Sequence, residues 1–510
     1  MNNQIKKGKS MNDNKPIEWI KVPLIECVGI YDRYRKPISK IERDKRVSGK
    51  NCNDLFKYYG ATGLAGYIDD YLLEGEYVIL GEDGAPFLDS LKSKSYLVSG
   101  KFWVNNHAHI LKSYFNNKFL LHYLNQFNYK NYVSGTTRLK LNQTSMKKIP
   151  IIVPPLAEQE EVVSRIESLF SELDNGIENL KRAQKQLKLY RQSILRDAFE
   201  GKLTEEWRRS NPDKVEDPEV LVEKIKEARV EYYENQLEEW KERVEEWKSR
   251  GEVGKKPSRP SKLKEFTLST NKMKNIQGWT WMAFGNTFTE SPQNGIYKPA
   301  NLYGEGTKII RIDNFYDGVI NSKKTFKSLK LTEEEVEKYK LTNNNILINR
   351  VNSIDYLGKC GLCQNIDEST VFESNIMKIT VDNKNIVSKF ITLYLTSRIG
   401  ISELRKNAKH AVNQASINQT DVSNVLAPIC SLDEQNEVIK IVEEKLSICE
   451  NLERTLRSSL KRSELLRQSI LNKAFSGKLT KEWRKENQGL ITGENSAENL
   501  LKKTKEEKEG

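Results

Sequence analysis

The sequence contains 510 residues, of which 37% are hydrophobic and 30% are charged, with 83 Lys and Arg against 70 Asp and Glu. This length predicts three or four domains, and the high charge favours small cores joined by long, solvated helices. The absence of any run of about 18 apolar residues argues against a membrane span. The six scattered cysteines argue against a disulfide-stapled secreted fold and favour the cytoplasm.

The first 150 residues are predicted to form a mixed α/β block behind a polar tail. Residues 1–15 have no apolar stretch, so a disordered tail is expected here rather than a signal peptide. Alternating apolar residues predict strands at Glu76–Gly84 and Lys101–Leu111. A helix is predicted at Phe115–Phe127.

A long helix follows, because apolar residues from Val162 to Ala198 recur at steps of three, four and seven. This narrow stripe is typical of a coiled coil, and the 42 residues from Glu158 to Phe199 would span roughly 60 Å. Gly201 stands where a helix ends on a residue with positive φ. A short second helix is then expected, with Thr204 as its cap and Trp207 as its apolar anchor.

The segment Pro218–Arg250 is rich in helix formers and carries its own apolar seam, which includes Trp240 and Trp247. The Gly- and Pro-containing stretch Gly251–Lys262 ends this helix. We find no counterpart of the segment later in the sequence. It is interpreted as a hairpin arm that packs on the chain's own helices.

A second mixed block covers residues 266–429. Strands are predicted at Thr307–Phe315, Asn344–Ser353 and Asn375–Asp382, and a helix at Ser388–Lys406. A second long helix follows, with the capping-box spacing of Ser431 and Glu434 at its start. The last residues read as a flexible, charged tail.

The two long helices belong to a sequence repeat. Arg191–Arg208 and Arg467–Arg484 are identical at 14 of 18 positions, at an offset of 276 residues, and the alignment extends back to Leu141 and Ile417. We therefore predict an α+β fold with two α/β domains, separated by two long antiparallel coiled-coil helices and related by a pseudo-two-fold axis. The predicted segments are 1–150 (first α/β domain), 151–212 (first helical spacer), 213–265 (helical insert and linker), 266–429 (second α/β domain), 430–486 (second helical spacer) and 487–510 (tail).

The positive charge lies on the two variable blocks. Residues 1–150 carry a net charge of +10 and residues 266–430 a net charge of +5, whereas the rest of the chain carries −2. Two basic domains on a nearly neutral helical spacer suit a protein that holds a polyanion at two places.

The segment "VPPLAEQEEV" (Val153–Val162), its counterpart "SLDEQNEV" (Ser431–Val438) and the repeated "RQSIL…AF.GKLT.EWR" resemble the specificity subunit of type I restriction–modification systems. The resemblance covers nearly the whole chain. It implies that each variable block is a target recognition domain that reads one half of a bipartite double-stranded DNA sequence. It also implies that the helices separate these domains and dock two DNA methyltransferase (modification) subunits. Restriction or translocase subunits are further candidate partners.

The same resemblance implies that this chain is not an enzyme and holds no cofactor, with S-adenosylmethionine, ATP and Mg on partner subunits. The residues agree. Gly8-Lys9-Ser10 lacks the upstream glycine of a phosphate-binding loop, because position 3 is Asn3. Cys360 and Cys363 form a lone CxxC pair, whereas a structural zinc site needs four ligands. We predict neither a catalytic site nor a metal site.

Candidate DNA-binding residues were chosen as polar or basic side chains in loops or strand ends, because such side chains contact base edges and phosphates. In the first block they are Lys57, Tyr58, Tyr59, Thr62, Asn105, Asn106, His107, Thr137, Arg138 and Lys140; in the second they are Arg311, Asn314, Arg350, Asn352, Ser353, Lys359, Ser374, Asn375, Asn413, Gln414 and Ser416. Asn142, Gln143, Asn418 and Gln419 occur in both copies and are assigned to phosphate contact or to helix entry.

Candidate residues for the coiled coil or for subunit docking are Ile166, Leu173, Leu180, Leu187, Ile194, Trp207, Trp240, Trp247, Val442, Leu456, Ile470 and Trp483. Docking of a modification subunit on Trp240 and Trp247 is an alternative to the hairpin-arm interpretation. A two-headed coiled-coil scaffold that binds RNA or protein remains an alternative for the whole chain.

Overall fold

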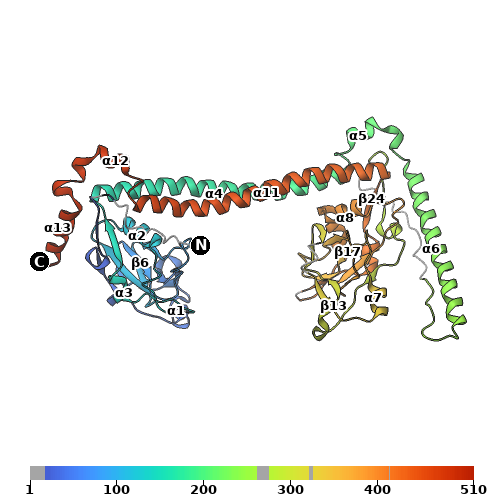
Figure 1. Ribbon diagram of the computed structural model, residues 1–510, viewed down its shortest axis with the longest axis horizontal. Coiled ribbons are helices and arrows are strands. Elements are labelled where there is room, and N and C mark those ends of the chain that lie inside the picture. The colour runs from blue at the N-terminus through green and yellow to red at the C-terminus, as the bar shows by residue number, and fades with distance from the viewer. Residues whose placement is uncertain (1–15, 17, 261–274, 321–325, 413, 510) are drawn as a thin grey trace, which may run out of the picture. The chain divides into compact units, whose positions relative to one another are not determined.

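The computed structural model describes residue 16 and the ranges 18–260, 275–320, 326–412 and 414–509. The predicted disordered tail and Asn413 lie outside these described residues. The chain forms two compact units, Met1–Ala183 with Thr455–Gly510, and Gln184–Arg454. Each unit therefore contains one variable block and parts of both long helices, as Figure 1 shows by colour.

The first block contains two four-stranded sheets and a separate strand pair. The strand pair joins β1 (Ile20–Pro23) to β10 (Pro150–Val153), so both ends of the block meet beside the start of the long helix. One sheet has the order β2-β9-β6-β7 and the other β4-β3-β8-β5. Their bounds are β2 Val28–Ile30, β3 Phe56–Gly60, β4 Gly63–Ile68, β5 Leu73–Glu74, β6 Tyr77–Gly81, β7 Ser95–Val98, β8 Lys101–Val104 and β9 Ala108–Ser113, with helices α1 Lys40–Val47, α2 Asn117–Gln126 and α3 Gln143–Lys147.

The second block repeats this plan at its ends, because β11 (Thr280–Ala283) pairs with β24 (Leu426–Ile429). Its sheets have the orders β12-β21-β17-β19-β15-β14, β16-β13-β20 and β18-β23-β22. The bounds are β12 Gln293–Asn294, β13 Tyr303–Ile310, β14 Phe315–Tyr316, β15 Gly318–Ile320, β16 Lys327–Leu329, β17 Ile346–Asn349, β18 Val351–Asn352, β19 Cys360–Leu362, β20 Thr370–Phe372, β21 Ile376–Ile379, β22 Lys409–His410 and β23 Ala415–Ser416, with helices α7 Glu333–Tyr339, α8 Ser388–Thr396, α9 Arg398–Arg405 and α10 Gln419–Ser423.

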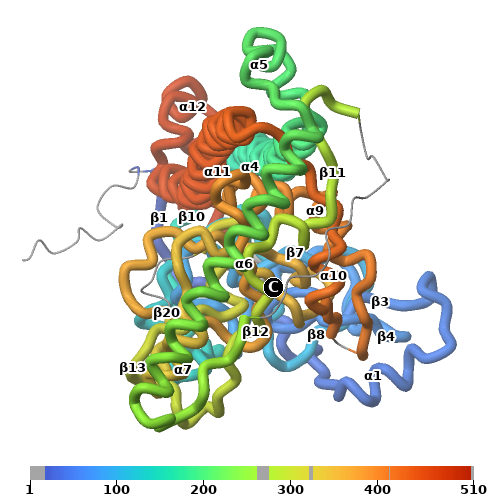
Figure 2. Tube along the Cα trace, turned by 90° about the vertical axis from the view of Figure 1, so that its right-hand side faces the viewer, coloured from blue at the N-terminus to red at the C-terminus, as the bar shows by residue number. Residues whose placement is uncertain are grey.

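The two long helices are α4 (Leu156–Phe199) and α11 (Leu432–Phe475), each of 44 residues. They lie side by side in Figures 1 and 2. In the first unit Val162 and Ile166 of α4 share a core with Ile470 of α11, and in the second Ile194 packs in a core with Val442. The start of each helix thus meets the end of the other, which confirms the predicted antiparallel pairing.

The middle of α4 has a thinner apolar stripe than its ends. Leu173, Leu180 and Leu187 are half-buried, whereas Ile166 and Ile194 are buried; Leu456 of α11 is half-buried as well. The central part is a two-helix seam, and the ends join the cores of the variable blocks. All of these residues lie on the predicted stripe.

Short helices follow both long helices, as predicted, at α5 (Glu205–Ser210) and α12 (Lys481–Glu486). Gly201 and Gly477 have φ values of 71° and 69°, in the left-handed region expected at a helix end. Thr204 occupies the predicted N-cap position of α5, but its side chain does not cap the helix. Its hydroxyl makes no cap bond and donates instead to Glu434, because a buried carboxylate lies within reach.

The insert forms α6 (Pro218–Ser249), which begins at the cap residue Asp217. Trp240 and Trp247 are half-buried, and their indole N–H groups donate to the carbonyls of Pro257 and Gly254 at 3.0 and 3.1 Å. The returning chain therefore covers both rings in part, in agreement with the hairpin-arm interpretation.

The tail is not the flexible segment that we predicted from its charge. It contains α13 (Ala497–Glu509), whose Leu501 packs in the core of the first unit. α13 starts 279 residues after α6 and buries Leu501 and Thr504 where α6 buries Val222 and Ile225. The first turns of α6 thus do have a counterpart, and only the later part of the insert is unique.

Candidate nucleic-acid interface

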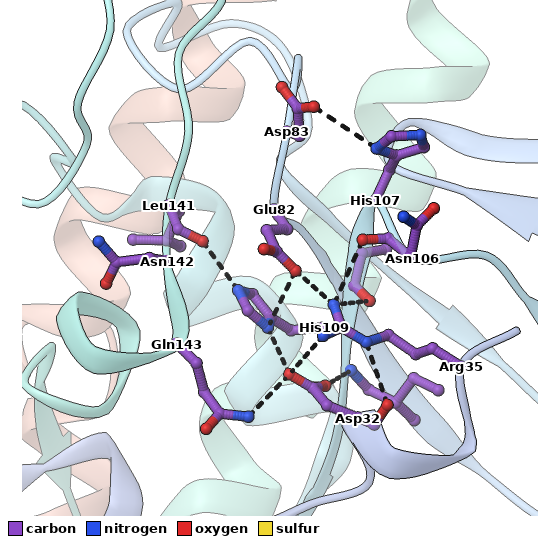
Figure 3. Close-up of polar contacts among 12 residues, drawn as sticks. Asp32, Arg35, Glu82, Asp83, Asn106, His107, His109, Leu141, Asn142 and Gln143 are labelled. Carbon is purple, nitrogen blue, oxygen red and sulfur yellow. Dashed lines mark hydrogen bonds and ion pairs between the residues drawn. The ribbon is translucent and has the colours of Figure 1, made fainter. Parts of the chain in front are cut away.

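Three segments of the first block meet at one surface cluster. Glu82, after β6, accepts a backbone hydrogen bond from Leu141 N at 2.7 Å, and the Gly84 amide donates to the carbonyl of Leu139 in the same loop at 3.0 Å. The Glu82 amide donates to the carbonyl of His107 at 2.8 Å, which adds the turn between β8 and β9. These bonds bring together the candidates Asn106, His107 and Lys140, and Figure 3 shows the first two beside Glu82 and Asp83.

Acidic side chains hold the basic ones in this cluster. Arg138 Nε lies 2.7 Å from Asp83 Oδ1, and His107 Nδ1 lies 3.5 Å from Asp83 Oδ2. Lys140 Nζ lies 3.5 Å from Glu82. The arginine, the lysine and the histidine remain 61%, 54% and 43% exposed, so they are positioned without being covered.

A buried polar network supports this cluster from below. His109 is fully buried, with Nδ1 at 2.7 Å from Asp32 and Nε2 at 2.8 Å from the carbonyl oxygen of Leu141 (Figure 3). Gln143 donates to Asp32 at 3.0 Å, and Arg35 bonds to Glu82. Both ring nitrogens of His109 face acceptor oxygens.

Asp32 is the anionic centre of this network. Burial by itself raises the pKa of Asp32, but the hydrogen bond and positive charge of His109, the Ile110 amide and Gln143 together outweigh burial. The pKa of Asp32 consequently lies below its ordinary value. The network ties the chain before α1 to β9 and to the start of α3.

Some candidates of the first block have structural roles. Tyr58 is 2% exposed and packs in the core beneath Arg43, so its assignment to DNA binding is wrong. Tyr59 packs against Tyr96 and Phe102. Asn105 accepts a hydrogen bond from the His107 amide and shapes the turn. The remaining candidates Lys57, Thr62 and Thr137 are exposed.

In the second block, five candidates meet at the start of β21. The Arg350 amide donates to the carbonyl of Asn375 at 2.8 Å, and its guanidinium donates to that of Ser374 at 3.1 Å. Arg311 pairs with Glu373 at 3.3 Å. Asn314 is 5% exposed and accepts from the Arg311 amide, so it shapes this turn and does not face a ligand.

Four further candidates of this block, Asn352, Ser353, Gln414 and Ser416, lie in or next to β18 and β23. Strand pairing places Asn352 opposite Ala415, and Ser416 opposite Val351. The Ser353 amide donates a hydrogen bond to Asn352 Oδ1 at 2.8 Å, and Gln414 lies exposed at the hairpin tip.

Lys359 is held between the rings of Tyr316 and Tyr356, at 4.3 and 4.0 Å from their centroids. Burial lowers the pKa of Lys359. The two tyrosine rings therefore restrict the position of the Lys359 ammonium group.

The four candidate residues that both repeats share make structural contacts. Asn142 and Asn418 cap α3 and α10 through their side chains. Gln143 joins the Asp32 network, and Gln419 donates to the carbonyl of Pro292 at 2.6 Å. These contacts favour helix entry over phosphate contact.

Sequence reasoning missed the acidic residues Glu82, Asp83 and Glu373, because it searched for cations and amides. It also missed Asp32. Trp19 and Trp279 stand directly before β1 and β11, so each repeat starts upstream of the aligned segment.

The two cysteines of the CxxC pair point into different cores, with Cys360 in the core beside the long helices and Cys363 in the core beneath β13. Burial raises the pKa of the Cys363 thiol to about 12. Two thiols on opposite faces of a strand do not converge on one metal ion. Among the residues that the structure describes, no group of three or more His, Cys, Asp or Glu is arranged to hold a metal. No helix in the described ranges is long and apolar enough to cross a membrane.

The type I restriction modification DNA specificity domain matches this chain twice, at residues 5–182 and 288–462. These matches cover more than half of the sequence, and the chain belongs to this family.

Among similar proteins, the Type I restriction enzyme EcoBI specificity subunit of Escherichia coli is 25% identical over 498 residues, which are 96% of this chain and 92% of the relative. The EcoKI specificity subunit of Escherichia coli (strain K12) is 26% identical over 396 residues, 76% of this chain and 71% of the relative. A solved structure of a type I R-M system chain has a TM-score of 0.57 at 16% identity, over 91% of this chain and 99% of that chain. This last similarity supports the fold alone.

Proposed function

We propose that this chain is the DNA-reading specificity subunit of a type I restriction–modification complex and that each variable block reads one half of a bipartite duplex sequence. The observation that carries the proposal is the cluster of Arg138, Lys140 and His107 on one exposed surface of a basic block. The second block has its own surface around Arg311 and Arg350. Family membership identifies the ligand class as DNA and gives no support to the RNA- or protein-binding alternative.

Duplex binding at several salt concentrations tests this proposal. Each phosphate contact contributes about 0.9 to the slope of log affinity against log salt. Lys57→Ala together with Lys140→Ala should weaken binding to all duplexes and reduce the slope by up to about 2. Lys502→Ala with Lys503→Ala, on the exposed side of α13, removes the same charge and should leave the slope unchanged. A wild-type protein that binds single-stranded RNA more tightly than every duplex would overturn the proposal.

Exposed apolar residues on the long helices support a docking surface for partner subunits. Leu189 and Tyr190 of α4 are 59% and 49% exposed, and the equivalent residues of α11, Leu465 and Leu466, are 56% and 48% exposed. Exposed apolar residues at the same two positions of both repeats favour two copies of one partner. The partner is a DNA methyltransferase subunit, which would supply S-adenosylmethionine and the methyl-transfer chemistry, while ATP and Mg would belong to restriction or translocase subunits.

Native mass spectrometry of the complex with the purified methyltransferase subunit tests this docking. Leu189→Glu with Tyr190→Glu should reduce two bound subunits to one, and so should Leu465→Glu with Leu466→Glu. All four changes together should abolish docking. Retention of two subunits by the fourfold variant would place the docking surface elsewhere.

A further inference from the structure

The strongest unassigned feature of the reading surfaces is the way in which two arginines are held. Arg138 approaches Asp83 through Nε, at 2.7 Å from Oδ1. The Arg138 side chain is 61% exposed. A carboxylate therefore holds the guanidinium at Nε, while much of the side chain remains exposed to solvent.

The backbone around this pair is arranged to leave room for the guanidinium. Gly84 has a φ of +77°, and a Cβ atom built on it would lie 3.2 Å from Arg138 Nε. The Gly84 amide donates to the carbonyl of Leu139 at 3.0 Å, which fixes the loop that carries Arg138 against the loop that carries Asp83. Asp83 is 22% exposed and also lies near His107, so its carboxylate has little freedom to move.

The second block contains the same arrangement from unrelated sequence. Arg311 Nε lies 3.3 Å from Glu373 Oε2, and Glu373 Oε1 accepts a hydrogen bond from the Ile312 amide at 2.6 Å. Glu373 is 13% exposed and Arg311 30% exposed. Arg46 is held differently, because both its Nε and its Nη2 contact Asp69 at 2.6 Å.

The two terminal amino groups of a guanidinium match the O6 and N7 acceptors of guanine in the major groove, and bidentate Arg–guanine contacts are the commonest specific protein–DNA contacts. A carboxylate on Nε orients the fork without occupying it. The carboxylate also disfavours a nearby phosphate, since both are anions.

We propose that each variable block reads a guanine with one arginine, Arg138 held by Asp83 in the first half-site and Arg311 held by Glu373 in the second. The arginines are the specificity-determining residues, and Asp83 and Glu373 are positioning residues. This inference rests on the proposed function, because it requires the blocks to bind duplex DNA.

Selection from a pool of duplexes with randomised sequence, performed with the full chain and its methyltransferase subunits, tests the inference. The wild type should enrich a two-part motif with a guanine in each half. Arg138→Ala should lose the preference for one guanine, about 10- to 100-fold, and should keep the other half-site. Arg311→Ala should lose a guanine in the other half only. Arg138→Lys keeps the charge but lacks the fork, so it should also lose the guanine while it retains the salt dependence of binding.

Two further measurements separate base reading from general attraction. Replacing the affected guanine by 7-deazaguanine removes the N7 acceptor, so it should weaken binding of the wild type but not of Arg138→Ala. Arg182→Ala is the matched control, because Arg182 is 64% exposed and pairs with Glu178 on the same unit; it should leave the motif unchanged. Asp83→Asn should weaken discrimination at the same guanine as Arg138→Ala and at no other position.

Three other results would overturn the inference, and they differ in whether the proposed function survives. An unchanged motif for Arg138→Ala with weaker binding to every duplex would make Arg138 a phosphate contact and overturn the inference, while the proposed function would stand. A wild-type half-site with no guanine on either strand would do the same. Enrichment of no motif by the wild type would overturn the proposed function, and the inference with it.

Discussion

Glu158 and Arg484, 326 residues apart, form a buried ion pair with Oε1 and Nη2 separated by 2.5 Å. Thr480 and Trp19 donate to the same carboxylate at 2.6 and 2.7 Å. The second unit repeats the pair as Glu434 and Arg208, also at 2.5 Å. The start of each long helix is thus completed by the segment that follows the other long helix.

This exchange explains the repeated sequence motifs in structural terms. The glutamate of each Leu-x-Glu-Gln motif forms an ion pair with the arginine of the Glu-Trp-Arg motif in the other copy. The glutamine of the motif donates to a carbonyl just before its own helix, as Gln159 does to Pro154 at 2.9 Å. Buried charges need such partners because desolvation of an unpaired charge is expensive. The two motifs therefore depend on one another although they lie in different copies.

The first prediction concerns this buried pair. Glu158→Gln should destabilise the first unit by about 3–5 kcal/mol, because Arg484 would keep a buried charge without a carboxylate. Hydrogen exchange should show faster opening of the first unit and little change in the second. Glu178→Gln, which breaks the exposed pair with Arg182, is the control and should have an effect below about 1 kcal/mol. Equal effects of the two changes would contradict a structural role for the buried pair.

The second prediction concerns the boundaries of the reading modules. Because β1 pairs with β10, a replacement block must bring both strands, so an exchange of residues 18–153 should fold and change one half-site only. An exchange that stops at residue 149 splits this strand pair between two proteins and should yield less folded protein. The motif enriched from random duplexes and the yield of soluble chimaera measure these effects. Alteration of both half-sites by the first chimaera would disprove independent reading.

The architecture was largely predictable, and the reading surface was predictable only in part. The offset of 276 residues and the periodic stripe from Val162 to Ala198 were enough to predict duplicated antiparallel helices, because both features can be read directly from the sequence. The prediction that Tyr58 binds DNA was wrong because Lys57 and Tyr58 point to opposite faces of a strand, and only Lys57 faces solvent. Asp83 and Glu373 could not be found without the loop geometry, since their role depends on a guanidinium distant in sequence.

The third prediction is a pH dependence of the first block. The pKa of Asp32 is lowered below its ordinary value of 3.8, so ionised Asp32 stabilises the fold above that pH. The stabilisation is lost as the pH falls through the lower, folded-state pKa. Asp32→Asn should therefore reduce the steepness of acid unfolding, while at neutral pH it should destabilise the block by about 1–3 kcal/mol through the loss of the carboxylate acceptor for His109. Denaturant unfolding between pH 2.5 and 7 measures both effects; parallel profiles for the variant and the wild type would contradict the assignment.

The fourth prediction concerns the long helices. α4 and α11 each run from one unit into the other, and Leu180 and Leu456 are equivalent positions of the repeat. Insertion of four helix-forming residues after both leucines lengthens each helix by about 6 Å, which corresponds to one or two base pairs at about 3.4 Å each. The apolar stripe tolerates four residues only as a stutter, so some stability should be lost.

If the helices set the distance between the half-sites, duplexes enriched by the insertion variant should keep both half-sites and gain one or two unspecified bases between them. A four-residue insertion after Gly251, in the segment that returns from α6, is the matched control and should leave the spacer as in the wild type. Insertion in α4 alone should disturb the pairing with α11 and weaken binding more than the double insertion does, because the two stripes would no longer be in register. A double-insertion variant that folds, binds DNA and enriches the wild-type spacer would show that the recognition spacing is fixed by something other than helix length.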